Sequence, residues 1–339
     1  MIIVLKPGIP KKDENAVLQE IRKLGYQPHV MRGVARTVIG AIGDELSHAN
    51  LNALGAQFPK AVESVMPIQK RYKLVSREAH PANSTVRVGK QIIGGKKFQV
   101  MAGPCSVESE TQLLKTAEAV KRAGATILRG GAFKPRTSPY EFQGLGEKGL
   151  KLLAKARKET GLAIITELLS ENHAELVAEY ADILQIGARN AQNFQLLIAA
   201  AKTGKPVLLK RGLSMKIEEW LLAGEYVLAN ENPNLMFCER GIRTFETYTR
   251  NTLDLSTIPI IKHESHCPVV IDPSQGVGRS DLVASMCKGA VAMGADALLI
   301  EVHPNPAEAW SDGAQQVTLD GFAKLMKELK PFIAAAGRE

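Results

Sequence analysis

Apolar positions in the first 66 residues recur at two different periods. Residues 13–24 and 46–58 carry apolar side chains at helical spacing, so each segment predicts an amphipathic helix. Short apolar runs that predict strands lie at Ile2–Lys6, Gln27–Arg32, Thr37–Ile42 and Ala61–Met66. The resulting order β-α-β-β-α-β is that of the split βαβ motif. We therefore expect residues 1–70 to form a small ferredoxin-like α+β domain.

The next segment, residues 71–97, has no long periodic pattern. Residues 75–83 are typical of a linker. Residues 86–98 contain the adjacent glycines Gly94 and Gly95, and this pattern predicts a hairpin. We expect the hairpin to plug or cover the domain that follows it.

From Phe98 onward, short apolar runs alternate with amphipathic helical stretches. The runs are Gln99–Ala102, Thr126–Arg129, Ala163–Thr166, Asp182–Ile186, Pro206–Lys210, Leu235–Glu239, Pro268–Asp272 and Ala297–Glu301. Helical spacing is clearest in Leu150–Glu159, Glu171–Glu179, Asn193–Lys202, Leu282–Met293 and Phe322–Ile333. Eight strands that are apolar on both faces predict a closed parallel (β/α)8 TIM barrel over residues 98–339. A doubly wound open sheet is the alternative, and residues 243–256 show no regular pattern.

Length and composition agree with this division. A chain of 339 residues accommodates a barrel of about 250 residues and a small module. The formal net charge of +8 would suit nucleic acid, a membrane surface or anionic substrates. No run of five like charges occurs, and only 5% of the residues are aromatic, which is poor for stacking on bases. We therefore expect no nucleic-acid partner and favour anionic small molecules.

The cysteines and the lengths of the apolar runs indicate the cellular compartment of the protein. The four cysteines form no CxxC pair, and the apolar start of the chain is too short for a secretory signal. No stretch approaches 18 consecutive apolar residues, so no membrane-spanning helix and no membrane partner are expected. These features favour a reducing, cytoplasmic location.

Cations gather directly after the apolar runs, at what would be the C-terminal face of the barrel. Those that follow the second, fourth, fifth and sixth runs are Arg129, Lys134, Arg136, Arg189, Lys210, Arg211 and Arg240. One such residue is usually a solvated rim residue. Several converging on one mouth repel each other unless an anion lies among them. Because Arg and Lys both bind phosphate and carboxylate, we expect substrates that carry those groups.

A second constellation comes from the first and last runs, which become neighbours when the barrel closes. Cys105, Glu301 and Asp312 offer a thiolate and two carboxylates, and such a set could hold a divalent metal. A buried cysteine beside two rim acids is the alternative. No GxGxxG, GxxxxGK[ST] or GxSxG motif occurs, so neither a usual nucleotide loop nor a nucleophile elbow is supported.

Several motifs resemble, in order, those of the bacterial barrel-type DAHP (3-deoxy-D-arabino-heptulosonate 7-phosphate) synthases. They are AGPCSVES, LRGGAFKPRTSPYEFQGLG, QIGARN, LLKRG, CERGIRTFE, DPS followed by GR, and IEVHPNP with SDG. The resemblance covers residues 98–339, and the KPRTSPYEFQG stretch is its most specific part. The front domain resembles the regulatory module of one subclass, in which an aromatic amino acid binds and inhibits.

The resemblance implies condensation of phosphoenolpyruvate with erythrose 4-phosphate, releasing phosphate, as the first step of aromatic amino-acid biosynthesis. It implies that phosphoenolpyruvate is bound by Arg129, Lys134, Ala188, Arg189, Lys210 and Arg240. It implies that erythrose 4-phosphate is bound by Lys134, Pro135, Arg136 and Thr137. Lys134, Cys105 and Asp312 would be the catalytic residues, with Lys134 a candidate proton donor to the developing alkoxide. A homo-oligomer, specifically a tetramer, is also implied.

The metal site departs from the family at one position. The resemblance implies Cys105, Glu301 and Asp312 as ligands of manganese, iron, cobalt or a similar divalent ion. The fourth ligand of the family is a histidine directly after Asp-Pro-Ser, where this chain has Gln275. A neutral amide oxygen is a weaker ligand for such metals than imidazole, so we expect weak metal binding by Cys105, Gln275, Glu301 and Asp312.

Three rival functions stay open at this point. The related KDO-8-phosphate synthases share the superfamily. Lys210, at the end of the fifth run, could instead form a Schiff base in an aldolase. The replacement at Gln275 also admits a weakly catalytic barrel that serves as an aromatic amino-acid sensor.

Overall fold

The computed structural model describes residues 1–33, 36–43, 51–66 and 71–339. These residues form two compact units. The first comprises residues 1–82 with 264–266, and the second comprises residues 83–263 with 267–339. The division at 82/83 lies inside the segment predicted to be linker and hairpin.

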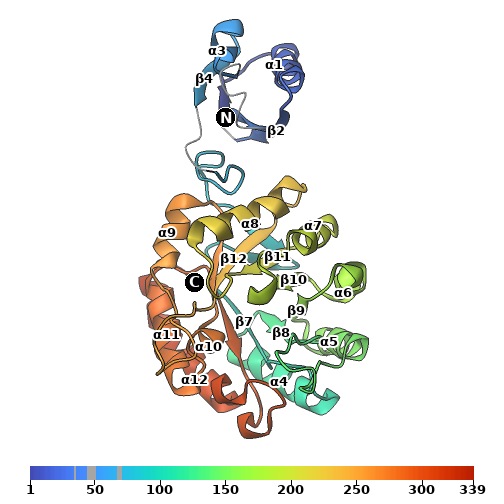
Figure 1. The fold of residues 1–339 in the computed structure, drawn as a ribbon. Helices are drawn as coiled ribbons and strands as arrows, with labels where there is room; N and C mark the ends of the chain where they lie inside the picture. The colour runs from blue at the N-terminus through green and yellow to red at the C-terminus, as the bar shows by residue number, and fades with distance from the viewer. Residues whose placement is uncertain (34–35, 44–50, 67–70) are drawn as a thin grey trace. The chain divides into compact units, whose positions relative to one another are not determined.

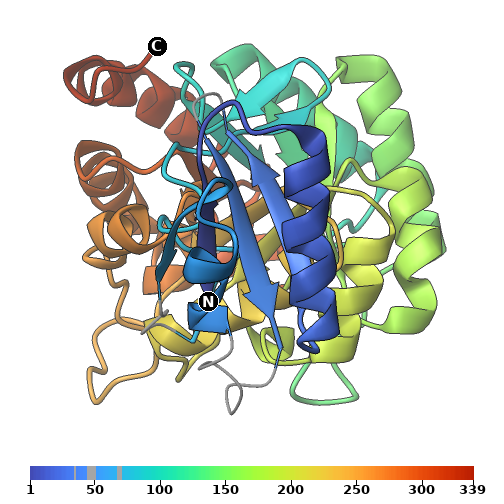
Figure 2. The ribbon, with the colours of Figure 1, turned by 90° about the horizontal axis from the view of Figure 1, so that it is seen from above.

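The first unit is built on a four-stranded antiparallel sheet with strand order β2-β3-β1-β4. Its elements are β1 (Ile2–Leu5), α1 (Lys11–Lys23), β2 (Gln27–Arg32), β3 (Thr37–Ile42), α3 (Leu54–Gln57) and β4 (Val62–Met66). Helix α1 lies alongside the sheet (Figure 2) and buries Val17, Leu18 and Ile21 in the core. This order and topology confirm the ferredoxin-like prediction. Residues 46–50 of the second predicted helix lie outside the described residues.

The second unit is a closed barrel of eight parallel strands. The strands are β7 (Gln99–Gly103), β8 (Ile127–Arg129), β9 (Ala163–Leu168), β10 (Ile183–Ile186), β11 (Val207–Lys210), β12 (Leu235–Glu239), β13 (Val269–Ile271) and β14 (Ala297–Glu301). Each strand overlaps one of the eight predicted runs. Strand β14 pairs with β7 from Ala297↔Gln99 to Glu301↔Gly103, which closes the sheet and excludes the open-sheet alternative.

The helices form the outer layer around these strands (Figure 1). They are α4 (Glu110–Ala123), α5 (Glu147–Thr160), α6 (Ala174–Tyr180), α7 (Phe194–Lys202), α8 (Ile217–Ala229), α9 (Thr257–Glu264), α11 (Ser280–Ala292) and α12 (Leu319–Ala335). The short helix α10 (Pro273–Val277) is largely buried and packs against β14 and α11. Local signals set several ends. The Ser109 side chain accepts from the backbone N–H of Gln112 at the start of α4, and Gly124 ends that helix at φ +105°.

The predicted hairpin is a plug. Strands β5 (Val86–Val88) and β6 (Gln91–Ile93) pair with each other. Val86, Val88 and Ile93 pack into the same buried cluster as residues near the start of the barrel strands, such as Ile127 and Ile183. The hairpin therefore fills the end of the barrel where the strands begin, and the opposite end is left for chemistry. Among the described residues, no helix is long and apolar enough to cross a membrane.

Candidate active site

A cavity of about 350 Å³ lies at the carboxyl ends of the barrel strands. Eight of the predicted substrate-binding residues line this cavity: Lys134, Pro135, Arg136, Thr137, Ala188, Arg189, Lys210 and Arg240. Arg129 lies deeper and lines a smaller adjoining hollow together with Lys134. The structure thus brings together every substrate-binding residue that the sequence predicted.

Charge is the dominant property of this cavity. Seven Lys and Arg side chains but only three carboxylates line it. Lys134, Lys210 and Arg240 are each at most 6% exposed. Buried cations in such excess are stable only where anions offset them. The cavity is therefore suited to substrates that carry more than one negative group.

Lys134 lies at the junction of the cationic cavity and the cysteine. Its Nζ donates to the Cys105 carbonyl oxygen at 3.2 Å and lies 3.0 Å from the Cys105 Sγ. A Cβ on Gly131 would lie 2.8 Å from both the Cys105 oxygen and the Lys134 Cδ, so this close approach requires glycine. Burial by itself lowers the pKa of Lys134, but Cys105 and Glu301 raise it above its ordinary value. The ammonium is therefore charged at neutral pH.

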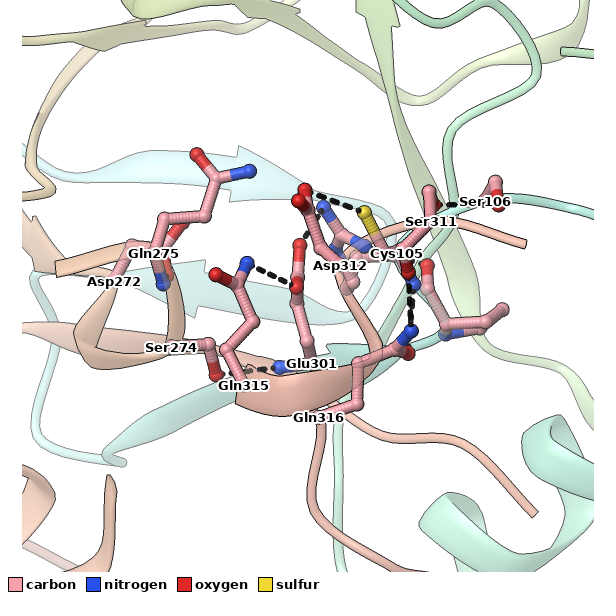
Figure 3. Close-up of polar contacts among 12 residues, drawn as sticks. Cys105, Ser106, Asp272, Ser274, Gln275, Glu301, Ser311, Asp312, Gln315 and Gln316 are labelled. Atoms are coloured by element: carbon pink, nitrogen blue, oxygen red, sulfur yellow. Dashed lines mark hydrogen bonds and ion pairs between the residues drawn. The ribbon is translucent and has the colours of Figure 1, made fainter. Parts of the chain in front are cut away.

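Cys105, Glu301 and Asp312 form a compact cluster beside Lys134 (Figure 3). Their possible ligand atoms all lie within 4.8 Å of one another, and the Cys105 Sγ is 3.4 Å from the Asp312 Oδ2. Burial, and next the charge of Glu301, raises the pKa of the Cys105 thiol to about 11. A nearby cation would favour the thiolate.

Glu301 provides the clearest sign that this cluster fits a metal. Its side chain is fully buried, and Gln315 Nε2 donates to its Oε2 at 2.6 Å. Its Oε1 lies 3.3 Å from the Arg129 Nη2 but has no hydrogen-bond partner among the described residues. A buried carboxylate oxygen left over in this way, beside a thiol and a second carboxylate, matches the donor set of a borderline divalent ion.

Gln275, the predicted fourth ligand, is turned to the cationic side. Its Oε1 accepts from the Lys210 Nζ at 3.4 Å and from an Arg240 Nη at 3.3 Å. In Figure 3 the amide nitrogen is on the side nearer Asp312 and the oxygen is on the far side. The structure brings Cys105, Glu301 and Asp312 together, but it does not add the oxygen of Gln275 to them.

Lys210 and Arg211, both predicted among the cations at the barrel mouth, form ion pairs with different acidic residues. Lys210, 1% exposed, forms a 2.5 Å ion pair with Asp272 and still lines the cavity. Arg211, counted with the cations of the mouth, does not line it. Its guanidinium bonds Glu239, Asp254 and Thr257. Arg211 is thus a structural anchor for the loop after β12, and counting it with the cations of the cavity was wrong, because its buried guanidinium is taken up by Glu239 and Asp254.

Sequence reasoning missed Arg243, Arg250 and Asn251, which line the cavity from the irregular segment after β12. Arg250 Nη1 also holds the metal-site cluster, at 3.2 Å from the Asp312 Oδ1 and 2.9 Å from the Gln315 Oε1. The only available signal was a pair of arginines in a stretch without periodicity. Loops that carry function commonly lack a regular pattern.

A buried network fixes the loop that carries Asp312. His303 Nε2 lies 3.1 Å from a carboxylate oxygen of Glu108, whose other oxygen accepts from the Trp310 backbone N–H at 2.9 Å. Ser106 and Ser311 are joined by their hydroxyls at 2.8 Å. These contacts tie the loop after β7 to the loop after β14, and so they set the spacing of Cys105 and Asp312.

Fold and site together define a class: a (β/α)8-barrel enzyme whose C-terminal mouth binds small anionic substrates beside a three-residue candidate metal site. The chain belongs to the DAHP synthetase I family, whose model matches residues 75–335. A second model, described as the DAHP synthase ferredoxin-like domain, matches residues 1–70. The chain therefore has the enzymatic activity of that family, the synthesis of DAHP.

Individual relatives agree with this assignment. A phospho-2-dehydro-3-deoxyheptonate aldolase of Thermotoga maritima is 49% identical over 99% of both chains. A crystal structure of the DAHP synthase of Thermotoga maritima covers all of this chain and 98% of its own, with 48% identity and a TM-score of 0.79. A 2-dehydro-3-deoxyphosphooctonate aldolase of Caulobacter vibrioides is 34% identical over 74% of this chain and 91% of its own.

Proposed function

We propose that the cavity binds phosphoenolpyruvate and erythrose 4-phosphate together and joins them. The observation that carries this proposal is the excess of buried cations at one barrel mouth. Phosphoenolpyruvate is assigned to the inner cations Arg129, Lys134, Arg189, Lys210 and Arg240, with the backbone of Ala188. Erythrose 4-phosphate is assigned to Lys134, Pro135, Arg136 and Thr137 on the loop after β8. Lys134 belongs to both sets because it lies between the two regions.

The chemistry follows from this arrangement. C3 of phosphoenolpyruvate attacks the aldehyde carbon of erythrose 4-phosphate, and the aldehyde oxygen takes up a proton. Water adds to C2, where positive charge develops, and the resulting tetrahedral centre expels inorganic phosphate. Lys134 is a suitable proton donor because neighbouring acidic groups keep it charged despite its burial. The surrounding arginines hold the phosphate and carboxylate groups in place.

We propose that Cys105, Glu301 and Asp312 hold a divalent ion such as manganese, iron or cobalt. The unpartnered Glu301 Oε1 and the mixed thiolate and carboxylate donors support this ligand set. Such an ion, when bound, supplies Lewis acidity toward the aldehyde oxygen. Gln275, which the sequence predicts as a fourth ligand, is left out of this set because its oxygen accepts from Lys210 and Arg240.

We further propose that the first unit senses an aromatic amino acid and that the enzyme is a cytoplasmic homotetramer. The match of residues 1–70 to the family's ferredoxin-like domain supports the regulatory assignment, because that unit contributes no residue to the cavity. The four free cysteines agree with a reducing compartment.

Phosphate release with phosphoenolpyruvate and each of two aldehydes tests the reaction. Erythrose 4-phosphate should support turnover, and arabinose 5-phosphate should support little. The reverse preference would favour the octulosonate reaction of the 34%-identical relatives. Turnover should fall on chelation and return with added divalent metal. Absence of turnover with either aldehyde would favour the sensor alternative. Borohydride should trap no adduct, because the Lys210 ammonium is paired with Asp272.

A further inference from the structure

Two hydrogen bonds of its own backbone hold Gln275 in position. It lies in the short helix α10, whose start is capped by Asp272: the Asp272 Oδ1 accepts from the Gln275 backbone N–H at 2.9 Å. The Gln275 carbonyl oxygen accepts from Asn251 Nδ2 at 3.0 Å. The side chain therefore extends from a fixed point beside the cationic wall of the cavity.

The buried guanidinium of Arg240 needs a hydrogen-bond acceptor on the side where Gln275 lies. It is 4% exposed, and its Nε has no hydrogen-bond partner among the described residues. Its guanidinium is within hydrogen-bond distance of only two acceptors in that part of the chain, the Gly241 carbonyl oxygen at 3.3 Å and the Gln275 Oε1 at 3.3 Å. An underpaired buried guanidinium points to an anion as its missing partner. Gln275 supplies the one side-chain acceptor that orients it.

Lys210 shares the same oxygen. Its ammonium is held by Asp272 at 2.5 Å and by the Gln275 Oε1 at 3.4 Å. One amide oxygen thus lies between two cations of the cavity. An oxygen that accepts from two cations is poorly available as a metal ligand, and the amide nitrogen has no lone pair to offer.

We propose that Gln275 is a positioning residue of the anion site: its amide oxygen holds Lys210 and Arg240 for the phosphoenolpyruvate anion, and Cys105, Glu301 and Asp312 bind their divalent ion without it. A neutral acceptor suits this task because it aligns the cations without cancelling their charge. A carboxylate at the same place would compete with the substrate. The inference rests on the proposed substrate, so its test measures binding directly rather than turnover.

Calorimetric titrations of the full-length protein provide the test. Chelator-treated protein is titrated with phosphoenolpyruvate and with inorganic phosphate, and separately with Co²⁺. Gln275→Leu removes the acceptor at similar size. Gln315→Leu is the matched control, because Gln315 is the amide that donates to the metal-site carboxylate Glu301.

Gln275→Leu should weaken phosphoenolpyruvate and phosphate binding about tenfold, as expected for lost alignment of charge-assisted contacts, and leave Co²⁺ affinity within about threefold. Gln315→Leu should lower Co²⁺ affinity, and it should weaken anion binding less than Gln275→Leu does, since on the anion side it removes an acceptor from Arg250 alone. Gln275→Glu should bind the anions more weakly still, whereas a merely structural amide would be replaced well by Glu. In steady-state assays Gln275→Leu should raise the KM for phosphoenolpyruvate more than it lowers kcat.

Three results would overturn the inference. In the first, Gln275→Leu loses Co²⁺ affinity tenfold while its anion binding stays intact. In the second, it loses Co²⁺ affinity and anion affinity in parallel, and in the third neither affinity changes. Failure of the wild-type protein to bind phosphoenolpyruvate would instead count against the proposed substrate. The two failures are therefore distinguishable.

Discussion

At the scale of single residues, the site depends on how each charged group is paired. Lys210 and Arg211 are adjacent in sequence, yet Lys210 lines the cavity whereas Arg211 pairs with the buried Glu239 and stabilises the fold. Lys134 contacts the candidate metal ligand Cys105 and also lines the cavity proposed to bind the substrates. This position links the two halves of the proposed chemistry.

Replacing Lys134 by Ala should reduce kcat by about 10² or more, because a positioned charge that acts on the reacting oxygen is lost. Far-UV circular dichroism should show an unchanged fold. Lys151→Ala is the control, since Lys151 is an exposed partner of Glu147 on the outer helix α5. Normal turnover by the Lys134→Ala variant in the phosphate-release assay would contradict the assigned role.

Gln275→His should tighten divalent metal binding by about one to two orders of magnitude, by analogy with other changes in a ligand shell. Imidazole is a better ligand than an amide for borderline metals, and the resemblance to the family implies a histidine at this position. Titration with Co²⁺ measures the change. Equal affinity in the wild type and the variant would show that position 275 cannot reach the ion.

At the scale of elements, the segment after β12, residues 243–256, has no regular secondary structure pattern but is held in place by hydrogen bonds. Arg211 fastens it through Asp254 and Thr257 while also pairing with the buried Glu239. Arg243 and Arg250 then project from this segment into the cavity lining. A buried ion pair thus supports a loop that carries cations to the site.

Arg211→Leu should destabilise the barrel by about 3–5 kcal/mol, since it leaves the Glu239 carboxylate buried without its partner. Urea unfolding measures the loss. Arg279→Leu breaks the exposed pair with Asp281 and should change stability by less than about 1 kcal/mol. Similar effects for the two variants would remove the basis for calling Arg211 an anchor.

The segment Glu264–His266, which begins with the last residue of α9, belongs to the first unit. The pKa of His266 is lowered to about 4, chiefly by burial and to a lesser extent by His80 and Arg77, against the opposing effect of the hydrogen bond to the Leu74 carbonyl. The unfolded chain takes up this proton near pH 6.5, and the folded chain does so only near pH 4. Stability should therefore fall as the pH drops through this window.

Melting temperatures at pH 7 and pH 5 test this linkage. The wild-type protein should lose more stability on acidification than His266→Gln, which cannot take up the proton. Above pH 7 the difference between the two proteins should no longer change with pH. An identical pH dependence would mean that His266 is not the group responsible.

At the scale of the whole molecule, the catalytic cavity and the proposed regulatory domain belong to separate units. Every residue that lines the cavity belongs to the second unit. The hairpin of β5 and β6 is part of that unit and fills the barrel end. A truncation must therefore keep Val86 onward to leave the barrel core intact.

A protein that begins near Thr85 should keep its synthase activity and lose inhibition by phenylalanine or tyrosine. It should also melt at a somewhat lower temperature, because residues 264–266 lose contacts such as the Arg77–Glu264 backbone hydrogen bond. Activity assays with each amino acid provide the measurement. Inhibition that persists after truncation would place the effector site in the barrel.

The sequence by itself determined the element order, the eight strands and the gathering of cations at their ends, because periodicity and strand position are local properties of the chain. It also indicated Cys105, Glu301 and Asp312, since the first and last strands of any closed barrel are neighbours. Tertiary structure alone decided how each side chain is paired. The direction of the Gln275 oxygen, the diversion of Arg211 into the fold and the arrival of Arg250 at Asp312 depend on contacts between loops distant in sequence, which no local pattern encodes.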